Sequence, residues 1–232
     1  MDMDHPQRSA WLAGIVSPRP LILASTVDKN GIKNLAPLSS VMGVSNTPPL
    51  FIASFSRNRR KEYRGTLLNM RQTGKAILHV MPSTLQAVDW IDMAGSPILP
   101  DQSEWDLIDI TPHDEDELLI KQAIAAIEVE LVEEKELPGA VARLAVMKVT
   151  HIWASSDKIP ETGLDVLTQH GMDNMNAIVC PRAAHASPCQ SGDLPGPARD
   201  LPSPARHGRL RNGTPPAVHH IDPVDRSGRG KP

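Results

Sequence analysis

The chain has 232 residues, a formal net charge of -3, 40% hydrophobic residues and 22% charged residues. These values are typical of a soluble globular protein, and the absence of a basic excess disfavours nucleic-acid binding. No apolar run reaches the roughly 18 residues that a membrane span requires. The acidic start, Met1 to His5, lacks the apolar core of a secretory signal. We therefore expect a cytoplasmic protein that binds neither nucleic acid nor membrane.

The composition changes abruptly near residue 177. From Cys180 to Pro232 the chain contains ten prolines, six glycines and no Glu, Met or aromatic residue. Such a segment buries too little apolar surface to offset its ordering entropy. We predict a globular domain over residues 1–176 and a disordered tail over residues 177–232. Two interpretations of this tail stay open: a natural basic tail that binds acidic partners, or the product of a shifted reading frame.

Within the domain, apolar strands alternate with turn signals. A strand is predicted over Leu21–Val27, and Asp28–Gly31 follows as a hairpin turn, because Asn-Gly tolerates the positive φ that such a turn requires. A return strand is predicted over Ile32–Ser40. A second turn at Thr47–Pro49 then leads into a third strand over Leu50–Phe55.

Two segments show helical spacing. The first is Tyr63–Thr73, which ends at Gly74. The second is Ser83–Ala94, with Ser83 as the predicted N-cap. Its predicted buried face consists of three aliphatic residues: Leu85, Val88 and Ile91.

Three further strands are predicted over Ala76–Met81, Ala123–Leu131 and Ala142–Ala154. The last two are joined by a turn at Pro138–Gly139. Six strands in mostly antiparallel hairpins, with helices inserted between them, predict a mainly β protein: a small barrel with peripheral helices.

Hydroxyl and guanidinium groups gather between the third strand and the first helix. Such groups beside a helix start suit a phosphate, because the first-turn amides also favour an anion. The residues concerned are Ser54, Ser56, Arg57, Arg64 and Thr66. A solvated basic turn is the alternative for the arginines, and ordinary turn or strand chemistry is the alternative for Asn34, Ser39 and Ser40.

The first hairpin carries an ordered set of residues: Arg19-Pro20, Ser25-Thr26, Gly31, Asn34, Ala36-Pro37 and Ser39. This set resembles the R-P-x-x-x-x-S-T-x-x-x-x-G-x-x-N-x-A-P-x-S opening of the flavin reductase-like family, the FMN-binding split-barrel flavoproteins that include flavoredoxin. The resemblance continues through Val44–Leu50, which is similar to the family's V-S-x-x-P-P-x segment. It covers roughly Arg19 to Ala154.

A later segment, Arg64–Met70, resembles the family's K-D-T-x-x-N-I pattern with two departures. Gly65 stands where the family has an acidic residue, and Arg64 stands where it has Lys. The G-R-x-G-x-x-Y-like segment that usually closes the family's sequences is not found before the tail.

The resemblance implies an FMN-binding split β-barrel and a homodimer. It implies a flavin reductase or a flavoredoxin-like electron carrier that uses NADH or NADPH, with a monooxygenase or another electron acceptor as partner. The implied cofactor-binding residues are Ser25, Thr26, Asn34, Ala36, Pro37, Ser39, Ser40, Ser54, Ser56, Arg57, Arg64 and Thr66. No catalytic side chain and no metal ligand is assigned, because the cofactor itself carries the hydride chemistry.

Two alternatives remain at this point. The chain could hold flavin or another anionic ligand without turnover, as a binding protein. It could also be a defective family member whose altered C-terminus prevents assembly.

Overall fold

A computed structural model of the chain describes residues 20–57, 65–98, 102–156, 162–170, 172 and 218–221. Arg64, one of the predicted cofactor-binding residues, lies outside these ranges. Most of the predicted tail lies outside them as well, together with both cysteines, Cys180 and Cys189.

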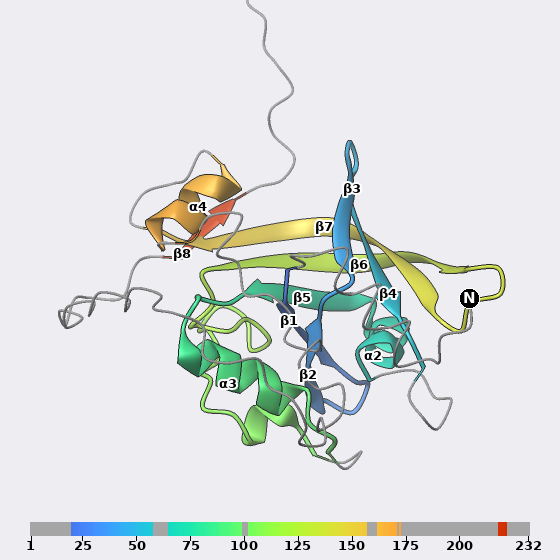
Figure 1. Cartoon of the computed structure of the whole chain (residues 1–232), viewed down its shortest axis with the longest axis horizontal. Coiled ribbons are helices and arrows are strands. Elements are labelled where there is room, and N and C mark those ends of the chain that lie inside the picture. The colour runs from blue at the N-terminus through green and yellow to red at the C-terminus, as the bar shows by residue number, and fades with distance from the viewer. Residues whose placement is uncertain are drawn as a thin grey trace, which may run out of the picture.

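Eight antiparallel strands form one sheet (Figure 1). They are β1 (Ile22–Val27), β2 (Lys33–Leu38), β3 (Val41–Asn46), β4 (Pro49–Phe55), β5 (Lys75–Val80), β6 (Ala125–Glu136), β7 (Arg143–Ser155) and β8 (Val218–Ile221). The order across the sheet is β2-β1-β5-β6-β7-β4-β3, and β8 pairs with β7. β2 and β3 are therefore the two ends of the sheet, although they are consecutive in the chain.

The turn between β1 and β2 forms as the sequence predicts. Gly31 has a φ of 85°, a value that favours glycine. The Asp28 carboxylate accepts hydrogen bonds from the amides of Asn30 and Ile32, each 2.8 Å long. These bonds, that from Ile32 foremost, hold the pKa of Asp28 below its usual value.

The β3–β4 hairpin differs from the prediction. A single return strand was predicted over Ile32–Ser40, but β2 ends at Leu38 and Val41–Asn46 forms a separate strand paired with β4. Gly43, Ser45 and Asn46 interrupt the apolar pattern of this strand, so a count of apolar residues misses it. The hairpin projects from the body of the molecule (Figure 1).

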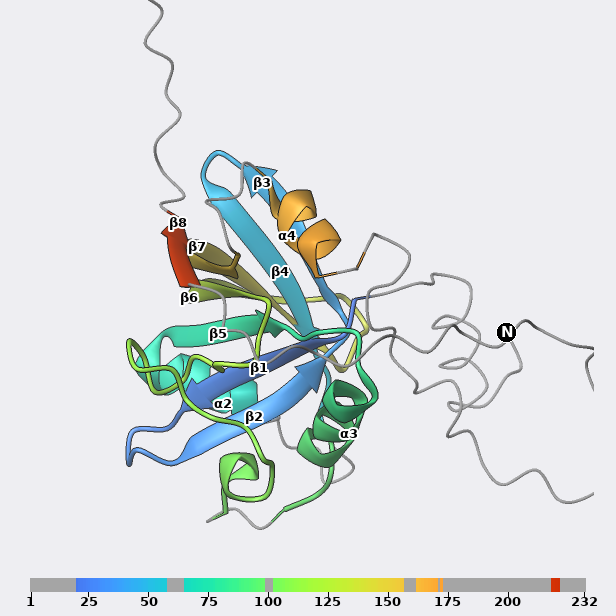
Figure 2. The same ribbon diagram turned by 90° about the vertical axis from the view of Figure 1, so that its left-hand side faces the viewer.

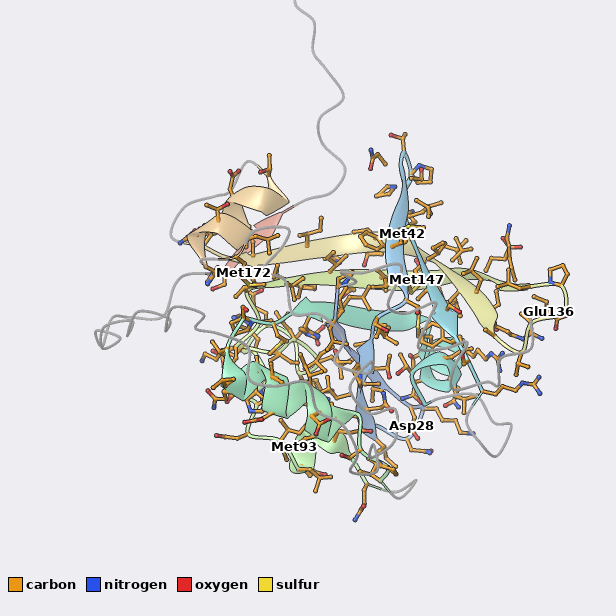
Figure 3. The ribbon with its side chains drawn as sticks, viewed as in Figure 1. Asp28, Met42, Met93, Glu136, Met147 and Met172 are labelled. Carbon is orange, nitrogen blue, oxygen red and sulfur yellow. The ribbon has the colours of Figure 1, made fainter. Side chains whose placement is uncertain are left out.

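Methionine side chains mark the contrast between this hairpin and the body. Met42 on β3 is 59% exposed, whereas Met147 on β7 is fully buried (Figure 3). The long β6–β7 hairpin forms a second projection, separate from the β3–β4 hairpin, and carries Glu136 near its tip (Figure 3). Its turn contains Gly139, with a φ of 72°, as the Pro138–Gly139 signal predicts.

One buried cluster receives side chains from seven strands and one helix, so the sheet curls around a common core. Its buried members are Ile22, Ala24, Leu38, Val41, Ala53, Phe55, Leu67, Met70, Ala76, Leu78, Val129, Ala145, Met147 and Val149. The helix is α2 (Gly65–Thr73), which contributes Leu67 and Met70. The predicted fold class, a mainly β barrel with inserted helices, is thereby confirmed.

A second helix, α3 (Leu85–Ala94), lies beside β2 (Figures 1 and 2). Its N-cap is Thr84, whose hydroxyl accepts a hydrogen bond from the Ala87 amide at 3.2 Å. The predicted cap, Ser83, is one residue too early. Both residue types favour this position, so sequence alone separates them poorly.

The predicted buried face of α3 is partly wrong. Leu85 is 85% exposed and Val88 is 38% exposed, while Ile91 is buried as predicted. The buried face consists of Ala87, Trp90, Ile91 and Ala94. A count of aliphatic residues misses this face because small and aromatic side chains form most of it.

The segment 108–124 covers the opposite face of the sheet from the barrel core. His79 on β5 connects this segment to β1 and is fully buried. Its Nε2 atom accepts a hydrogen bond from the Ile120 amide, so the ring proton lies on Nδ1, which donates to the Leu23 carbonyl; both distances are 3.1 Å. Burial lowers the pKa of His79 to about 4.

The outer edge of β2 is covered by the short helix η1 (Glu104–Asp106). The Glu104 carboxylate accepts a hydrogen bond from the Leu35 amide at 2.9 Å. Glu104 is 7% exposed, and burial raises its pKa. The Glu104 side chain therefore bonds to the Leu35 amide, a backbone donor that has no partner strand because β2 ends the sheet.

After β7 the structure describes α4 (Gly163–Gln169), which is N-capped by Thr162. Within the predicted tail it describes β8 alone, so the boundary at residue 177 and the disorder of the tail stay predictions. Among the helices in the described ranges, none has both the length and the apolar character needed to cross a bilayer. The same ranges contain no group of three or more metal-ligating side chains.

Candidate functional site

Four polar side chains meet where α2 begins against the first hairpin. Asn34 on β2 donates from Nδ2 to the hydroxyl oxygens of Thr26 and Thr66, at 3.4 and 3.2 Å. Asn69 on α2 donates from Nδ2 to the same Thr26 oxygen at 3.1 Å. We call Thr26, Asn34, Thr66 and Asn69 the amide–hydroxyl network. It joins β1, β2 and α2.

The pleat of the hairpin explains why Thr26 and Asn34 meet. They are directly paired across β1 and β2, so their side chains leave the sheet on the same face. This is the face of the barrel core, which Ala24 and Leu38 also share. Thr26 is fully buried, and Thr66 and Asn69 are 1% and 7% exposed.

Gly65, the first residue of α2, leaves room for Asn34. A Cβ atom built on Gly65 would lie 2.6 Å from Asn34 Oδ1, which is closer than real contacts. The acidic residue of the family pattern therefore has no space here while Asn34 keeps its position. As a result, the first turn of α2 contains no carboxylate.

A second set of predicted residues lies where β2 passes into β3. The Ser54 amide donates to the Ser40 carbonyl at 3.0 Å, which brings these two residues together. Ser39 and Ser54 are half-buried, and Ser40 is exposed. Their hydroxyls therefore lie near the end of β2, apart from the start of α2.

Ala36 and Pro37 point to opposite faces of β2. Ala36 is directly paired with Ala24 and shares the barrel-core face with Asn34. Pro37 shares the other face with Leu35, and its Cγ atom lies 3.5 Å from a Cβ built on Gly95, at the end of α3. Of the two, Ala36 is the one that adjoins the amide–hydroxyl network.

Ser56 and Arg57 are exposed residues just after β4. Arg57 lines an open cleft of about 510 Å³ together with the turn from Glu136 to Arg143. Because β4 pairs with β7 through Phe55 and Arg143, this cleft lies at the end of those two strands.

Ser25 lies apart from the other predicted residues. It is adjacent to Thr26 in β1, so its side chain leaves the opposite face of the sheet. Ser25 is fully buried, and its hydroxyl donates to the Leu118 carbonyl at 2.6 Å. Its partner belongs to the segment 108–124 that covers this face.

Asn69 is the site residue that the sequence prediction lacks. It follows Thr66 by three positions, and residues three apart lie on the same side of a helix. This Thr-x-x-Asn spacing at a helix start is the signal that could have identified it.

The donor set at the start of α2 fits a phosphate group. Hydroxyls, side-chain amides and first-turn backbone amides are donors that bind anions, and α2 has nine residues with no carboxylate in its first turn. The chemistry of these residues therefore agrees with the phosphate end of a mononucleotide. It offers no acidic ligands for a cation in the same place.

Comparison with known proteins gives a consistent result. The family model described as flavin reductase like domain matches residues 16–171. The BH2278 protein of Halalkalibacterium halodurans is 26% identical over 161 residues, which cover 66% of this chain and 76% of that protein. The YwrF protein of Bacillus subtilis is 31% identical over 93 residues, and the match spans 44% of its length.

Solved structures show the same fold. Nitrilotriacetate monooxygenase component B from Bacillus cereus has a TM-score of 0.59 and 25% identity, covering 65% of this chain and 77% of that one. A flavin-reductase-like protein with a split barrel domain from Shewanella frigidimarina has a TM-score of 0.58 and 17% identity, covering 87% and 94%. The fold is thus a split β-barrel, and because the family model matches more than half of the sequence, the chain belongs to the flavin reductase-like family.

Proposed function

We propose that this protein binds FMN and acts as an NAD(P)H-dependent flavin oxidoreductase. The observation that carries the proposal is the meeting of Thr26, Asn34, Thr66 and Asn69 at an acid-free helix start, in a chain of this family. The family supports flavin chemistry, and the donor set supports a ligand with a phosphate group.

The predicted residues would contact different parts of the ligand. The first-turn amides of α2 hold the phosphate, with Ser56, Arg57 and Arg64 as further donors from the segment before α2. Thr66, which is 1% exposed, fixes that turn through its hydrogen bond with Asn34. Asn34, Ser39, Ser40 and Ser54 supply polar contacts farther along the ligand. Ala36 allows its close approach to the barrel-core face of β2, whereas Pro37 lies on the other face, beside the end of α3. When bound, FMN supplies the redox chemistry, because its ring takes a hydride from a reduced nicotinamide.

A separate acceptor fits this proposal. Nitrilotriacetate monooxygenase component B, at 25% identity, is named as one component of a monooxygenase. By analogy, reduced flavin from this protein would pass to a monooxygenase or to another electron acceptor. Mixing the protein with FMN, NADH or NADPH and following nicotinamide oxidation by absorbance tests the first half of that reaction.

We also propose a homodimer. The β3–β4 hairpin projects from the body and exposes Met42 and Val44, which are 59% and 47% exposed. Burial of two such side chains against a second copy would remove apolar surface from water. Light scattering after size-exclusion chromatography measures the mass, and a monomer that still binds FMN fully would contradict this part of the proposal.

The central test is a titration of FMN followed by quenching of flavin fluorescence. The wild-type protein should quench FMN at a fixed stoichiometry, and Thr66→Val should weaken binding about tenfold, since it removes the hydroxyl that bonds Asn34 to the first turn of α2. Thr73→Val is the matched control at the other end of α2, where the hydroxyl donates only to the Asn69 carbonyl at 3.0 Å.

Two results would count against the proposal. Wild-type protein that neither quenches FMN nor oxidises a reduced nicotinamide would exclude it. Quenching without any nicotinamide oxidation would favour the alternative of a flavin-binding protein without turnover.

A further inference from the structure

Thr26 is in an unusual position for a residue of a binding site. It is fully buried, so its side chain cannot touch a ligand. Its hydroxyl oxygen nevertheless accepts two amide hydrogen bonds, from Asn34 at 3.4 Å and from Asn69 at 3.1 Å. A hydroxyl oxygen has two acceptor positions, and both are used here.

The two donors come from different elements. Asn34 belongs to β2, and Asn69 is the middle residue of α2. Thr26 on β1 therefore holds the helix to the hairpin at one shared oxygen. Leu67 and Met70 bury the same helix in the barrel core and orient its apolar face, while the directional hydrogen bonds to Thr26 and Asn34 fix its rotation more finely.

The rotation of α2 matters for its first turn. Thr66 lies on the same side of the helix as Asn69, and its hydroxyl is bonded to Asn34 at 3.2 Å. A small rotation of α2 would move Thr66 and the first-turn amides together. Misplacement of such groups by about 1 Å is enough to weaken their action greatly.

We propose that Thr26 and Asn69 are positioning residues for the phosphate of FMN, and that they act through the first turn of α2 without touching the ligand. This inference rests on the proposed function. It assigns Thr26 and Asn69, which bond to each other beneath the first turn of α2, to recognition of the phosphate end alone. They therefore set the preference for FMN over riboflavin, which lacks the phosphate.

The experiment compares the dissociation constants of FMN and riboflavin in the full chain by fluorescence quenching. Thr26→Val keeps the shape of the side chain and removes the shared oxygen. It should raise the dissociation constant of FMN about tenfold, which corresponds to the indirect loss of roughly one hydrogen bond to the phosphate. The dissociation constant of riboflavin should stay within about twofold of the wild-type value. Thr26→Ser restores the hydroxyl and should restore the preference for FMN. Asn69→Leu should resemble Thr26→Val.

Leu67→Val is the matched control. Leu67 is fully buried on the same helix but is not part of the network. This substitution should lower the melting temperature and change FMN and riboflavin binding by the same factor. If Thr26→Val also changes both by the same factor, its role is only structural and the inference is overturned.

A second measurement needs no flavin. Amide hydrogen exchange of the peptide covering residues 65–73 should be faster in Thr26→Val than in wild type, and Thr26→Ser should return it to the wild-type rate. Unchanged exchange would overturn the positioning role. If wild-type protein binds no FMN but exchange is still faster in Thr26→Val than in wild type, the proposed function is rejected and the structural part of the inference is kept.

Discussion

The two faces of β1 use neighbouring residues of similar chemistry in different ways. Ser25 faces outward and bonds to the Leu118 carbonyl of the covering segment 108–124. Thr26 faces the barrel core and accepts hydrogen bonds from Asn34 on β2 and Asn69 on α2. Both side chains are fully buried. The comparison shows that a Ser-Thr pair in a strand need not form one site, because the pleat sends the two hydroxyls to opposite faces.

The outward face should be sensitive to acid. The pKa of His79 is about 4 in the folded protein, below its ordinary value of 6.5. As the pH falls below 6.5, the unfolded chain takes up a proton that folded His79 does not. The free energy of unfolding should therefore decrease between pH 6.5 and pH 4 by up to about 3 kcal/mol, with no effect above that window.

Urea unfolding at a series of pH values measures this effect, with His79→Gln as the control that cannot titrate. The difference in the free energy of unfolding between wild type and His79→Gln should become smaller as the pH falls from 6.5 to 4. Parallel curves for wild type and His79→Gln would show that His79 does not link the outward face to pH.

Ser25→Ala tests the difference between the two hydroxyls directly. It leaves the Leu118 carbonyl without its partner, and it should lower the free energy of unfolding by about 1–3 kcal/mol. Because Ser25 faces away from the network, FMN affinity should stay at the wild-type value. A clear fall in FMN affinity without a matching fall for riboflavin would support the sequence-based role of Ser25 as a cofactor contact.

Gly65 and Asn34 should be energetically coupled on the inward face. In Gly65→Ala the new Cβ meets Asn34 Oδ1 at 2.6 Å, and Asn34 can move only by giving up its bonds to Thr26 and Thr66. We expect Gly65→Ala to destabilise the protein in the presence of Asn34 and to be neutral or stabilising in an Asn34→Ala background. A double-mutant cycle should give a coupling of about 1 kcal/mol. Additive effects would mean that the two residues do not share this space.

The smallest effect is expected on the exposed side of α3, the helix that covers the outward face. Leu85 is 85% exposed, so Leu85→Glu should change the free energy of unfolding by less than about 0.5 kcal/mol. Ile91→Ala on the buried side should cost about 2–5 kcal/mol. Thermal unfolding of both variants decides between the observed face and the face predicted from the sequence.

Local signals in the sequence identified much of the fold. Asn30-Gly31 and Pro138-Gly139 placed two hairpins correctly because their turns require a glycine with positive φ. β3 was missed because its exposed residues and Gly43 give no apolar pattern. The buried face of α3 was partly wrong because Ala87 and Trp90, rather than aliphatic residues, form it together with Ile91 and Ala94.

The candidate site was harder to predict than the fold. Motif resemblance identified Thr26, Asn34 and Thr66, which the structure brings together. It could not reveal that Thr26 is inaccessible or that Ser25 points elsewhere, because burial and direction depend on the pairing of β1 with its neighbours. Asn69 lies in the Thr-x-x-Asn spacing of the same motif, but its bond to Thr26 depends on the packing of α2 against β1, which joins residues 43 positions apart.

The contact between Glu104 and the Leu35 amide has a consequence beyond stability. β2 ends the sheet, and an unpaired strand edge can template the addition of an extended segment from another molecule. The Glu104 carboxylate at this edge takes the Leu35 amide, so that donor is not open to an incoming strand. We therefore expect this single buried acid to disfavour edge-to-edge association of β2 with another molecule.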